Sequence, residues 1–212
     1  MKAISDYETI LGTNRGEMTL KGSRFIGVAM PCPDEASIQD NIRQMEVEYR
    51  NATHYCWAAV YDGSERKDRS SDNGEPSGTA GKPILAVIKG TGLTNIMVVV
   101  IRYFGGTLLG TGGLVHAYTE AAKISVTGLN RQSFSACSTY RFTLDYPYYS
   151  VFESKCRDLM ARKPNCEYYD KVDVMVWVPV SRSEEFEKRI TDLTERHVRL
   201  TRGDDVYISI RV

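Results

Sequence analysis

Residues 96–118 constrain the fold more than any other stretch of this chain. The apolar run Ile96–Ile101 contains three successive valines and is followed by Arg102. A run that is apolar at both odd and even positions predicts a strand buried on both of its faces. Five glycines then lead into a segment with helical spacing that begins at Leu114. We therefore expect a central strand, a glycine-rich loop and a long helix in that order.

The glycine-rich loop between this strand and helix predicts a binding site. Glycines let the backbone approach another group closely, and a helix start offers unpaired N–H groups at the positive end of its dipole. We expect an anion or phosphate to bind at Gly105, Gly106 and Gly112. Arg102, at the end of the strand, supplies a cation there. The loop fails the GxGxxG dinucleotide pattern because Val115 takes the third glycine position, so close packing of helix on strand is an equally good interpretation.

A second motif, SDNGEPSGTAGKPIL at 71–85, combines charged residues with turn formers. Asp72 and Glu75 are carboxylates three residues apart, and Lys82 follows closely. Together with Ser77 they could bind a polar ligand or a metal, or transfer protons. The alternative is a turn that leads into a helix, and composition favours this alternative.

The histidines give no metal site. His54 and Cys56 share a strand face two residues apart, which would be half of such a site. No second pair has ligand spacing, so we predict no metal and no cofactor and interpret His54 as packed or hydrogen-bonded. His116 is expected in the first turn of the helix after the glycine loop, where the positive dipole end disfavours its charged form. There it would either hydrogen-bond a ligand or cap the fold.

Composition excludes several classes of protein. The chain has 212 residues, with 27 Lys plus Arg and 27 Asp plus Glu, so its formal net charge is zero. A dedicated nucleic-acid binder has an excess of positive charge, so such a contact would need a local patch. No segment reaches the ~18 apolar residues of a membrane span, and the first residues lack the apolar core of a signal peptide. The five cysteines form no CxxC pair, which favours reduced thiols in a cytoplasmic protein.

The remaining patterns predict two domains, residues 1–132 and 137–212, separated by a polar break at 130–136. In the first domain we expect a hairpin of 7–11 and 18–20, a strand over 24–30, a helix over 34–49, a strand over 52–61, a long surface loop over 62–81 and a helix over 83–90. The second domain has the order β-α-β-β-α-β, which is the ferredoxin-like signature.

Basic residues recur through the last third of the chain. They are Arg182, Lys188, Arg189, Arg196, Arg199 and Arg202. Acidic neighbours nearly cancel their charge, so a solvated helix face is the default interpretation and an RNA-contacting edge is the minority one.

Long consecutive identities connect three stretches to one known family. They are ATHYCWA at 52–58, SDNGEPSGTAGKPIL at 71–85 and VVVIRYFGGTLLGTGGLVHAY at 98–118. These stretches resemble the IMPACT family, in its bacterial, YigZ-like, two-domain branch. KGSRFIG at 21–27, which includes Arg24, is similar to the opening motif of that family. The tail resembles the small second domain of bacterial members, which is similar to a C-terminal domain of elongation factor G.

The resemblance implies an α+β fold. Its N-terminal part is a ribosomal-protein-type α/β two-layer domain with helices packed on one face of a sheet, and a ferredoxin-like domain follows. The resemblance also implies a link to translation, because eukaryotic members restrain a starvation-sensing kinase by competing for its activator. Bacteria lack that kinase, so only the association with translation carries over. The family usually has a second histidine where Tyr55 stands and an arginine where His116 stands.

Our leading hypothesis is a non-enzymatic cytoplasmic regulator that binds a translation-related protein or RNA. We expect one polar cleft between the acidic turn and the glycine turn. The predicted binding residues in it are Asp72, Glu75, Ser77, Lys82, Arg102, Gly105, Gly106, Gly112 and His116. His54 and Arg24 are secondary candidates. A second hypothesis is an enzyme acting on a small phosphorylated or peptide-like substrate. In it Asp72 and Glu75 serve as acid, base or metal ligand, and Arg102 orients the anion. A third is direct RNA or DNA binding.

Overall fold

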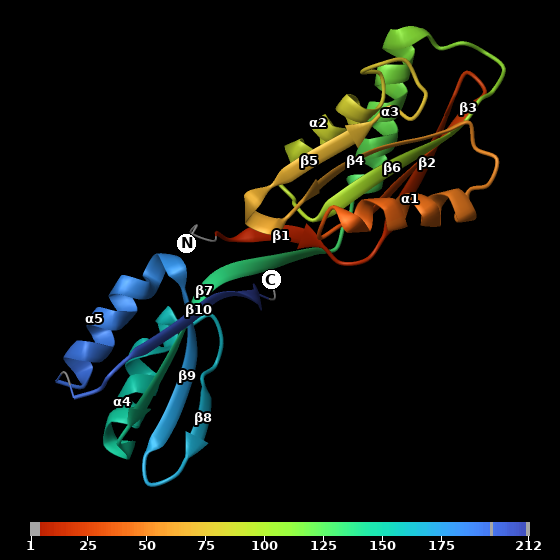
Figure 1. Cartoon of the computed structure of the whole chain (residues 1–212). Helices are drawn as coiled ribbons and strands as arrows, with labels where there is room; N and C mark the ends of the chain where they lie inside the picture. Colours follow the sequence, from red (N-terminus) through yellow and green to blue (C-terminus); the bar gives the residue numbers. More distant parts are fainter. Residues whose placement is uncertain (1–4, 196, 211–212) are drawn as a thin grey trace. The chain divides into compact units, whose positions relative to one another are not determined.

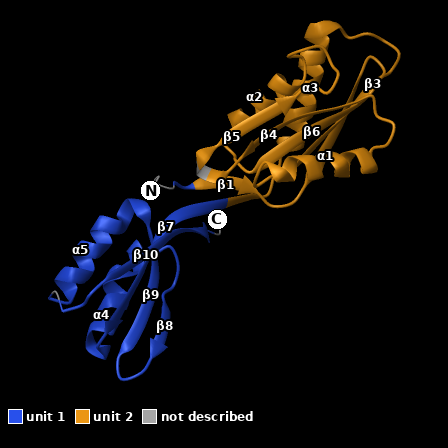
Figure 2. Ribbon diagram, in the orientation of Figure 1, with its two compact units in different colours: residues 1–6, 133–212 blue, residues 7–132 orange. Residues whose placement is uncertain are grey.

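A computed structural model describes residues 5–195 and 197–210, so Arg196 lies outside the described residues. The chain divides into two compact units (Figure 2). Unit 2 comprises residues 7–132, and unit 1 comprises the described residues before 7 and after 132. Both units combine helices with an antiparallel sheet, which confirms the predicted α+β class.

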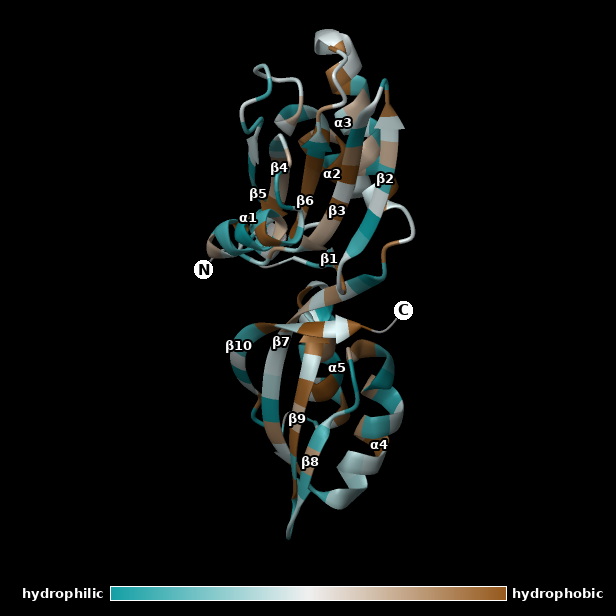
Figure 3. Ribbon diagram, turned by 90° about the vertical axis from the view of Figure 1, so that its right-hand side faces the viewer, coloured by the Kyte–Doolittle hydropathy of each residue, from teal (hydrophilic) through white to brown (hydrophobic). Residues whose placement is uncertain are grey.

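Unit 2 is built on a five-stranded sheet with the order β2-β3-β6-β4-β5 (Figure 1). Its strands are β2 (Asn14–Leu20), β3 (Ser23–Pro31), β4 (His54–Tyr61), β5 (Lys67–Ser71) and β6 (Ile96–Tyr103). β6 is the central strand, and every residue from Ile96 to Arg102 is buried. This confirms the predicted strand with two buried faces, and Figure 3 shows β6 mostly in the hydrophobic colour.

Helices cover both faces of this sheet. They are α1 (Ala36–Glu48), α2 (Gly81–Thr91) and α3 (Gly110–Val126). Val98 and Val100 of β6 join the cluster under α2 and α3, whereas Met97 and Val99 join the cluster under α1. The expected arrangement had helices on one face only. It differs from the structure because a central strand that is apolar at every position needs cover on both sides.

The first strands pair differently from the prediction. β2 pairs with β3 through a turn at Lys21 and Gly22, whose φ angles of 47° and 82° are typical of a tight hairpin turn. β1 (Tyr7–Ile10) forms no hairpin with β2, and the Leu11 N–H instead donates to the Asn130 carbonyl at 2.8 Å. The predicted hairpin of 7–11 with 18–20 is therefore wrong, because the turn-forming residues between them only connect the two strands.

The predicted long loop over 62–81 is also wrong in part. It contains a short 3-10 helix, η1 (Gly63–Glu65), and the edge strand β5, which pairs with β4. The residues of β5 are polar and mostly exposed, so they carry no hydrophobic pattern that would reveal a strand.

Unit 1 has the ferredoxin-like order of elements. They are β7 (Arg131–Leu144), α4 (Tyr146–Cys156), β8 (Asn165–Tyr168), β9 (Val172–Pro179), α5 (Ser183–Leu193) and β10 (Thr201–Ile210). β10, β7, β9 and β8 pair in that order, and the same five-stranded sheet includes β1, which also pairs with β7. Phe142 and Val174 of the sheet pack with Phe152 of α4 and Phe186 of α5. One face of the sheet is therefore covered by helices, and the predicted β-α-β-β-α-β order is confirmed.

The boundary between the units falls within β7, because unit 2 ends at Gln132. The residues 130–136 that we predicted as a polar break are thus mostly strand. Ser5 and Asp6 belong to unit 1, although the predicted first domain included them. The Asp6 carboxylate accepts hydrogen bonds from the Ala136 N–H at 2.8 Å and from the Ser135 hydroxyl at 3.2 Å.

The contact of α3 with β3 gives a prediction about Gly27. A Cβ atom at Gly27 would lie 2.2 Å from the carbonyl oxygen of Ala121. We expect Gly27→Ala to lower the free energy of unfolding by about 1–3 kcal/mol, because backbone has to move to admit the methyl group. Gly90→Ala is the matched control, since nothing lies within 4 Å of its Cβ position. Urea denaturation followed by circular dichroism measures both, and equal effects of the two changes would contradict this packing.

Candidate functional site

Arg102 and Glu75 are the two buried charged side chains among the described residues, at 5% and 9% exposure. Arg102 Nη1 lies 2.5 Å from Glu75 Oε1, and the Tyr118 hydroxyl donates to the same oxygen at 2.8 Å. The sheet register creates this meeting point, because β6 places Arg102 opposite Phe25 of β3 and His54 of β4. We call the residues joined here the Glu75 cluster: Ser23, His54, Cys56, Glu75, Arg102 and Tyr118.

The guanidinium of Arg102 also connects the strand to the glycine loop. Its Nη2 lies 3.4 Å from the Ser23 hydroxyl oxygen, and that oxygen accepts a hydrogen bond from the Gly105 N–H at 3.1 Å. The rings of Phe25 and Phe104 lie 5.4 and 5.5 Å from the guanidinium carbon, within the range of cation–π attraction. The Arg102 Nε is buried and has no hydrogen-bond partner among the described residues. The charge of Arg102 is therefore neutralised by Glu75 and screened from water by aromatic rings.

His54 is held in one orientation beside this ion pair. Its Nδ1 lies 2.8 Å from the carbonyl oxygen of Asn73. A carbonyl only accepts, so Nδ1 carries a proton. The His54 Nε2 lies 3.8 Å from Glu75 Oε1. His54 therefore faces the same carboxylate oxygen that Arg102 and Tyr118 contact.

Cys56 and Tyr118 complete the cluster as neutral groups. Burial raises the pKa of the Cys56 thiol to about 12, so it stays protonated at neutral pH. The thiol donates to the carbonyl oxygen of Asp72 at 2.9 Å. Burial also raises the pKa of Tyr118 and keeps its hydroxyl a donor to Glu75. A thiol in this state is a packing group and not a nucleophile.

Asp72 fixes the start of α2. One of its carboxylate oxygens accepts from the N–H groups of Ala80 and Gly81 at 2.9 and 2.8 Å, and the other accepts from Gly78 at 2.8 Å. Partial burial works to raise the pKa of Asp72, but these three donors and nearby Lys82 outweigh it, and the pKa is lowered overall. Asp72 is therefore an ionised loop anchor whose oxygens are occupied by backbone donors.

The structure brings together some of the predicted site residues and separates others. Asp72, Glu75, Arg102, Gly105 and His54 meet through the contacts above. Ser77, Lys82, Gly106 and Gly112 are exposed around them.

His116 lies apart from the cluster. The prediction that it stands in the first turn of α3 is wrong, because the helix already begins at Gly110. His116 is exposed and stands one turn before Glu120, whose pKa is lowered chiefly by a hydrogen bond from Lys123. Arg24 is also a surface residue, paired with Glu17 at 2.6 Å.

Sequence reasoning missed Ser23, Cys56 and Tyr118 as members of the cluster. Tyr118 stands on the face of α3 that also carries Leu114 and Ala121, so its burial was visible in the spacing. The spacing did not show that the Tyr118 hydroxyl donates to the Glu75 carboxylate. Ser23 lies inside the KGSRFIG stretch, but no local pattern shows that this stretch meets the glycine loop.

The glycine loop itself presents an exposed surface. Leu108 is 84% exposed, and Phe104 and Val115 are exposed beside it. Among the residues that the structure describes, a Cβ atom at Gly106 or Gly112 would meet nothing within 4 Å, and no side chain caps the start of α3. The loop therefore offers apolar side chains and free backbone N–H groups to a partner.

Segments from four parts of the chain surround this surface. Thr53 donates to the Arg102 carbonyl at 2.7 Å, and the Tyr103 hydroxyl donates to the Arg50 carbonyl at 3.2 Å. A Cβ atom at Gly105 would lie 1.9 Å from the backbone of Gly22. We call these segments, residues 21–24, 49–54, 72–82 and 102–116, the loop end of unit 2.

The described residues hold no group of three or more His, Cys, Asp or Glu side chains placed to bind a metal ion. Among the same residues, no helix is both long and apolar enough to cross a membrane.

Comparison with known proteins identifies the family. The Impact N-terminal domain matches residues 21–126, a range that contains the whole Glu75 cluster. The IMPACT family member YigZ of Escherichia coli (strain K12) is 31% identical over 183 residues, which cover 85% of this chain and 90% of that protein. The chain belongs to the IMPACT family. The resemblance seen in the sequence is thereby confirmed.

Two further matches, one relative and one solved structure, cover nearly the whole length of this IMPACT family member. The IMPACT family member YvyE of Bacillus subtilis (strain 168) is 28% identical over 205 residues, covering 97% of this chain and 94% of that protein. A solved structure titled as that of a hypothetical protein is 29% identical with a TM-score of 0.63, and the match covers 95% of this chain and 98% of that one. Membership in the IMPACT family associates the chain in general terms with regulation of translation.

The buried ion pair predicts unequal costs for two glutamate substitutions. Glu75→Ala leaves the Arg102 charge buried and unpaired, and we expect it to lower the free energy of unfolding by about 3–5 kcal/mol. Glu17→Ala breaks the exposed pair with Arg24, and we expect little change. Urea denaturation compares the two variants, and similar losses would show that burial of the Glu75 pair is unimportant.

The low pKa of Asp72 predicts a stability difference that depends on pH. A carboxylate with a lowered pKa in the folded state stabilises it above the unfolded pKa of about 4, and this contribution disappears as pH falls through the folded value. We expect wild type to exceed Asp72→Asn in urea midpoint at pH 7 and the gap to close below about pH 4. A gap that stays constant between pH 3 and pH 7 would contradict this role for the ionised carboxylate.

Proposed function

We propose that this chain is a non-enzymatic cytoplasmic regulator that binds a component of the translation machinery, protein or RNA, through the loop end of unit 2. One observation carries the proposal: the exposed Leu108 and Phe104 stand on a glycine loop that is anchored to a buried ion pair. Exposed apolar side chains held on a fixed backbone are typical of binding surfaces, because little ordering entropy is lost when a partner docks.

The charges of the loop end support a partner that carries anionic groups. Lys21, Arg50 and Lys82 are exposed, and none has an ion-pair partner among the described residues. Of the acidic groups nearby, Glu75 is neutralised by Arg102, and both oxygens of the ionised Asp72 are occupied by backbone N–H groups. A phosphate or carboxylate of the partner would find the uncapped N–H groups of α3 and these cations together.

The arrangement of the two carboxylates supports the non-enzymatic assignment. Asp72 uses both of its oxygens for backbone donors, and Glu75 is buried between Arg102 and Tyr118. A general acid or base needs access to its substrate within hydrogen-bond distance. Both carboxylates instead serve to position the loop that carries them.

The second candidate, an enzyme acting on a small phosphorylated or peptide-like substrate, has one observation in its favour. The Asn73 carbonyl fixes the tautomer of His54, as second partners do for catalytic and ligating histidines. Turnover of a phosphoester or dipeptide by the purified protein, lost in His54→Ala while the fold is retained, would favour this candidate.

The loop surface predicts how the protein sediments. In a sucrose gradient of cell extract at low salt, we expect the wild type in ribosomal fractions and Leu108→Ser reduced there by about fivefold or more, because about 1 kcal/mol of apolar contact is lost. Val47→Ser is the matched control, since Val47 is exposed on α1, on the opposite face of the sheet.

Two outcomes would count against the proposal. One is wild-type protein absent from every ribosomal fraction. The other is Leu108→Ser sedimenting as the wild type does. If binding uses phosphate contacts, the amount recovered falls steeply as salt rises.

A further inference from the structure

The outer edge of β8 pairs with no other strand among the described residues. β8 pairs with β9 on one side and ends the strand order of the sheet (Figure 1). The Tyr169 N–H donates to the Lys171 carbonyl at 2.9 Å, which fixes the alternation of backbone groups in this hairpin. Glu167 consequently directs its N–H and C=O toward β9, whereas Cys166 and Tyr168 direct theirs outward. An added strand would find these outward groups available.

Aromatic side chains flank this edge. Tyr168 and Tyr169 are 58% and 63% exposed, and Tyr146 at the start of α4 is exposed beside them. The Tyr146 hydroxyl donates to the Tyr169 carbonyl at 2.8 Å, and the rings of Tyr149 and Tyr168 stack edge to face at 5.8 Å. Tyrosine supplies a large apolar contact at low entropic cost, which is why it is enriched in interfaces.

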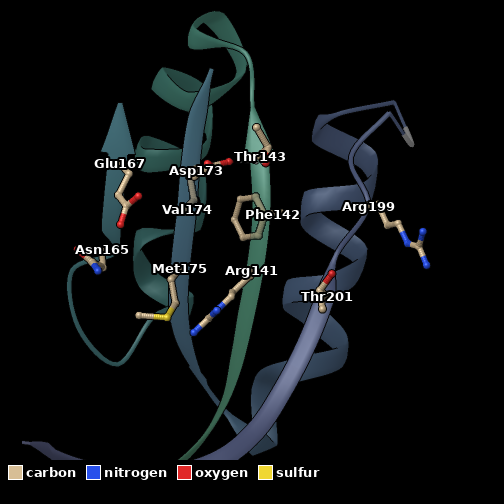
Figure 4. A pocket seen from close by; sticks show the side chains of 10 residues that line it. All are labelled: Arg141, Phe142, Thr143, Asn165, Glu167, Asp173, Val174, Met175, Arg199 and Thr201. Atoms are coloured by element: carbon tan, nitrogen blue, oxygen red, sulfur yellow. Dashed lines mark hydrogen bonds between the residues drawn. The ribbon is translucent and has the colours of Figure 1, made fainter. Parts of the chain in front are cut away.

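The other face of β8 is acidic. Glu167 stands directly opposite Asp173 of β9 on the face without helices (Figure 4). Neither carboxylate has an ion-pair partner among the described residues, although Thr143 donates to Asp173 and Tyr169 donates to Glu167. Like charges directly opposite each other destabilise a sheet. Both carboxylates line an open hollow of about 510 Å³ on this face. Arg141 of β7 and Arg199 line the same hollow on its far side, so a cation from outside reaches the carboxylates from the β8 edge (Figure 4).

We propose that β8 accepts an extended segment of a partner protein in which basic and apolar residues alternate. Side chains alternate between the two faces of an added strand. Its basic residues would lie beside Glu167 and reach Asp173, and its apolar residues would contact Tyr168 on the helix-covered face. A second copy of this chain fits poorly, because antiparallel pairing of two β8 strands about Glu167 sets the two glutamates against each other.

The test uses the full-length protein and a short fluorescent peptide in which lysine alternates with valine. We expect saturable binding by fluorescence anisotropy, and slowed hydrogen exchange at the Cys166 and Tyr168 amides when the peptide is bound. Glu167→Lys should weaken binding by about fivefold or more, because it replaces an attraction with a repulsion. Glu46→Lys makes the same change of charge on an exposed residue of α1 and should leave binding unchanged.

Two control peptides separate strand addition from simple charge attraction. One has the same composition in two blocks, valines followed by lysines, and the other has glutamate in place of lysine. Binding of either as tight as that of the alternating peptide would overturn the proposal. So would full affinity in Glu167→Lys with a native circular dichroism spectrum, or no protection of the two amides.

Discussion

The ion pair between Arg102 and Glu75 is the interaction on which the loop end of unit 2 depends. Moving two charges out of water costs several kcal/mol per ion, and this cost is offset only where geometry and further hydrogen bonds are good. Here Tyr118 adds a donor to the carboxylate, and Ser23 and two aromatic rings surround the guanidinium. Two strands, a helix and the acidic loop are thereby held together at one buried point.

Buried and half-buried side chains hold the backbone of the loop end through hydrogen bonds. The Gly105 N–H is tied to Ser23, and the start of α2 is tied to Asp72. The residues that sequence analysis singled out as ligands, Asp72 and Glu75, act in the structure as supports. The groups that face solvent, chiefly Leu108, Phe104 and the uncapped start of α3, are those a partner would meet.

The central part of the fold could be predicted because its signal is local. A strand with two buried faces, a glycine loop and a helix follow one another within 96–126. The strand leaves a continuous apolar run, the loop its glycines, and the helix a helical period of apolar residues. β5 could not be predicted, because an edge strand with polar residues has no such period. The false hairpin arose because β2 has two possible neighbours in sequence, and the tight turn at Lys21 and Gly22 pairs it with β3.

The candidate site shows the same limit. The contact of Glu75 with Arg102 could be predicted from charge and position. The hydrogen bond of Tyr118 could not, because Tyr118 fits the apolar face of its helix. His116 was predicted as a binding residue because the start of α3 was placed too late in the sequence. A helix start shifted by one turn changes which side chains face the loop. Hydrogen bonds between residues distant in sequence, such as those of Ser23, leave no trace in spacing.

The close approach of Gly22 and Gly105 has a consequence for how this surface can evolve. Neither position tolerates a side chain, since a Cβ at Gly105 would overlap the backbone of Gly22. Sequence changes that alter binding, in evolution or in redesign, are therefore confined to the exposed side chains between Gly105 and the first turn of α3. Insertions in this segment would lengthen the glycine loop without changing the contacts of the Glu75 cluster.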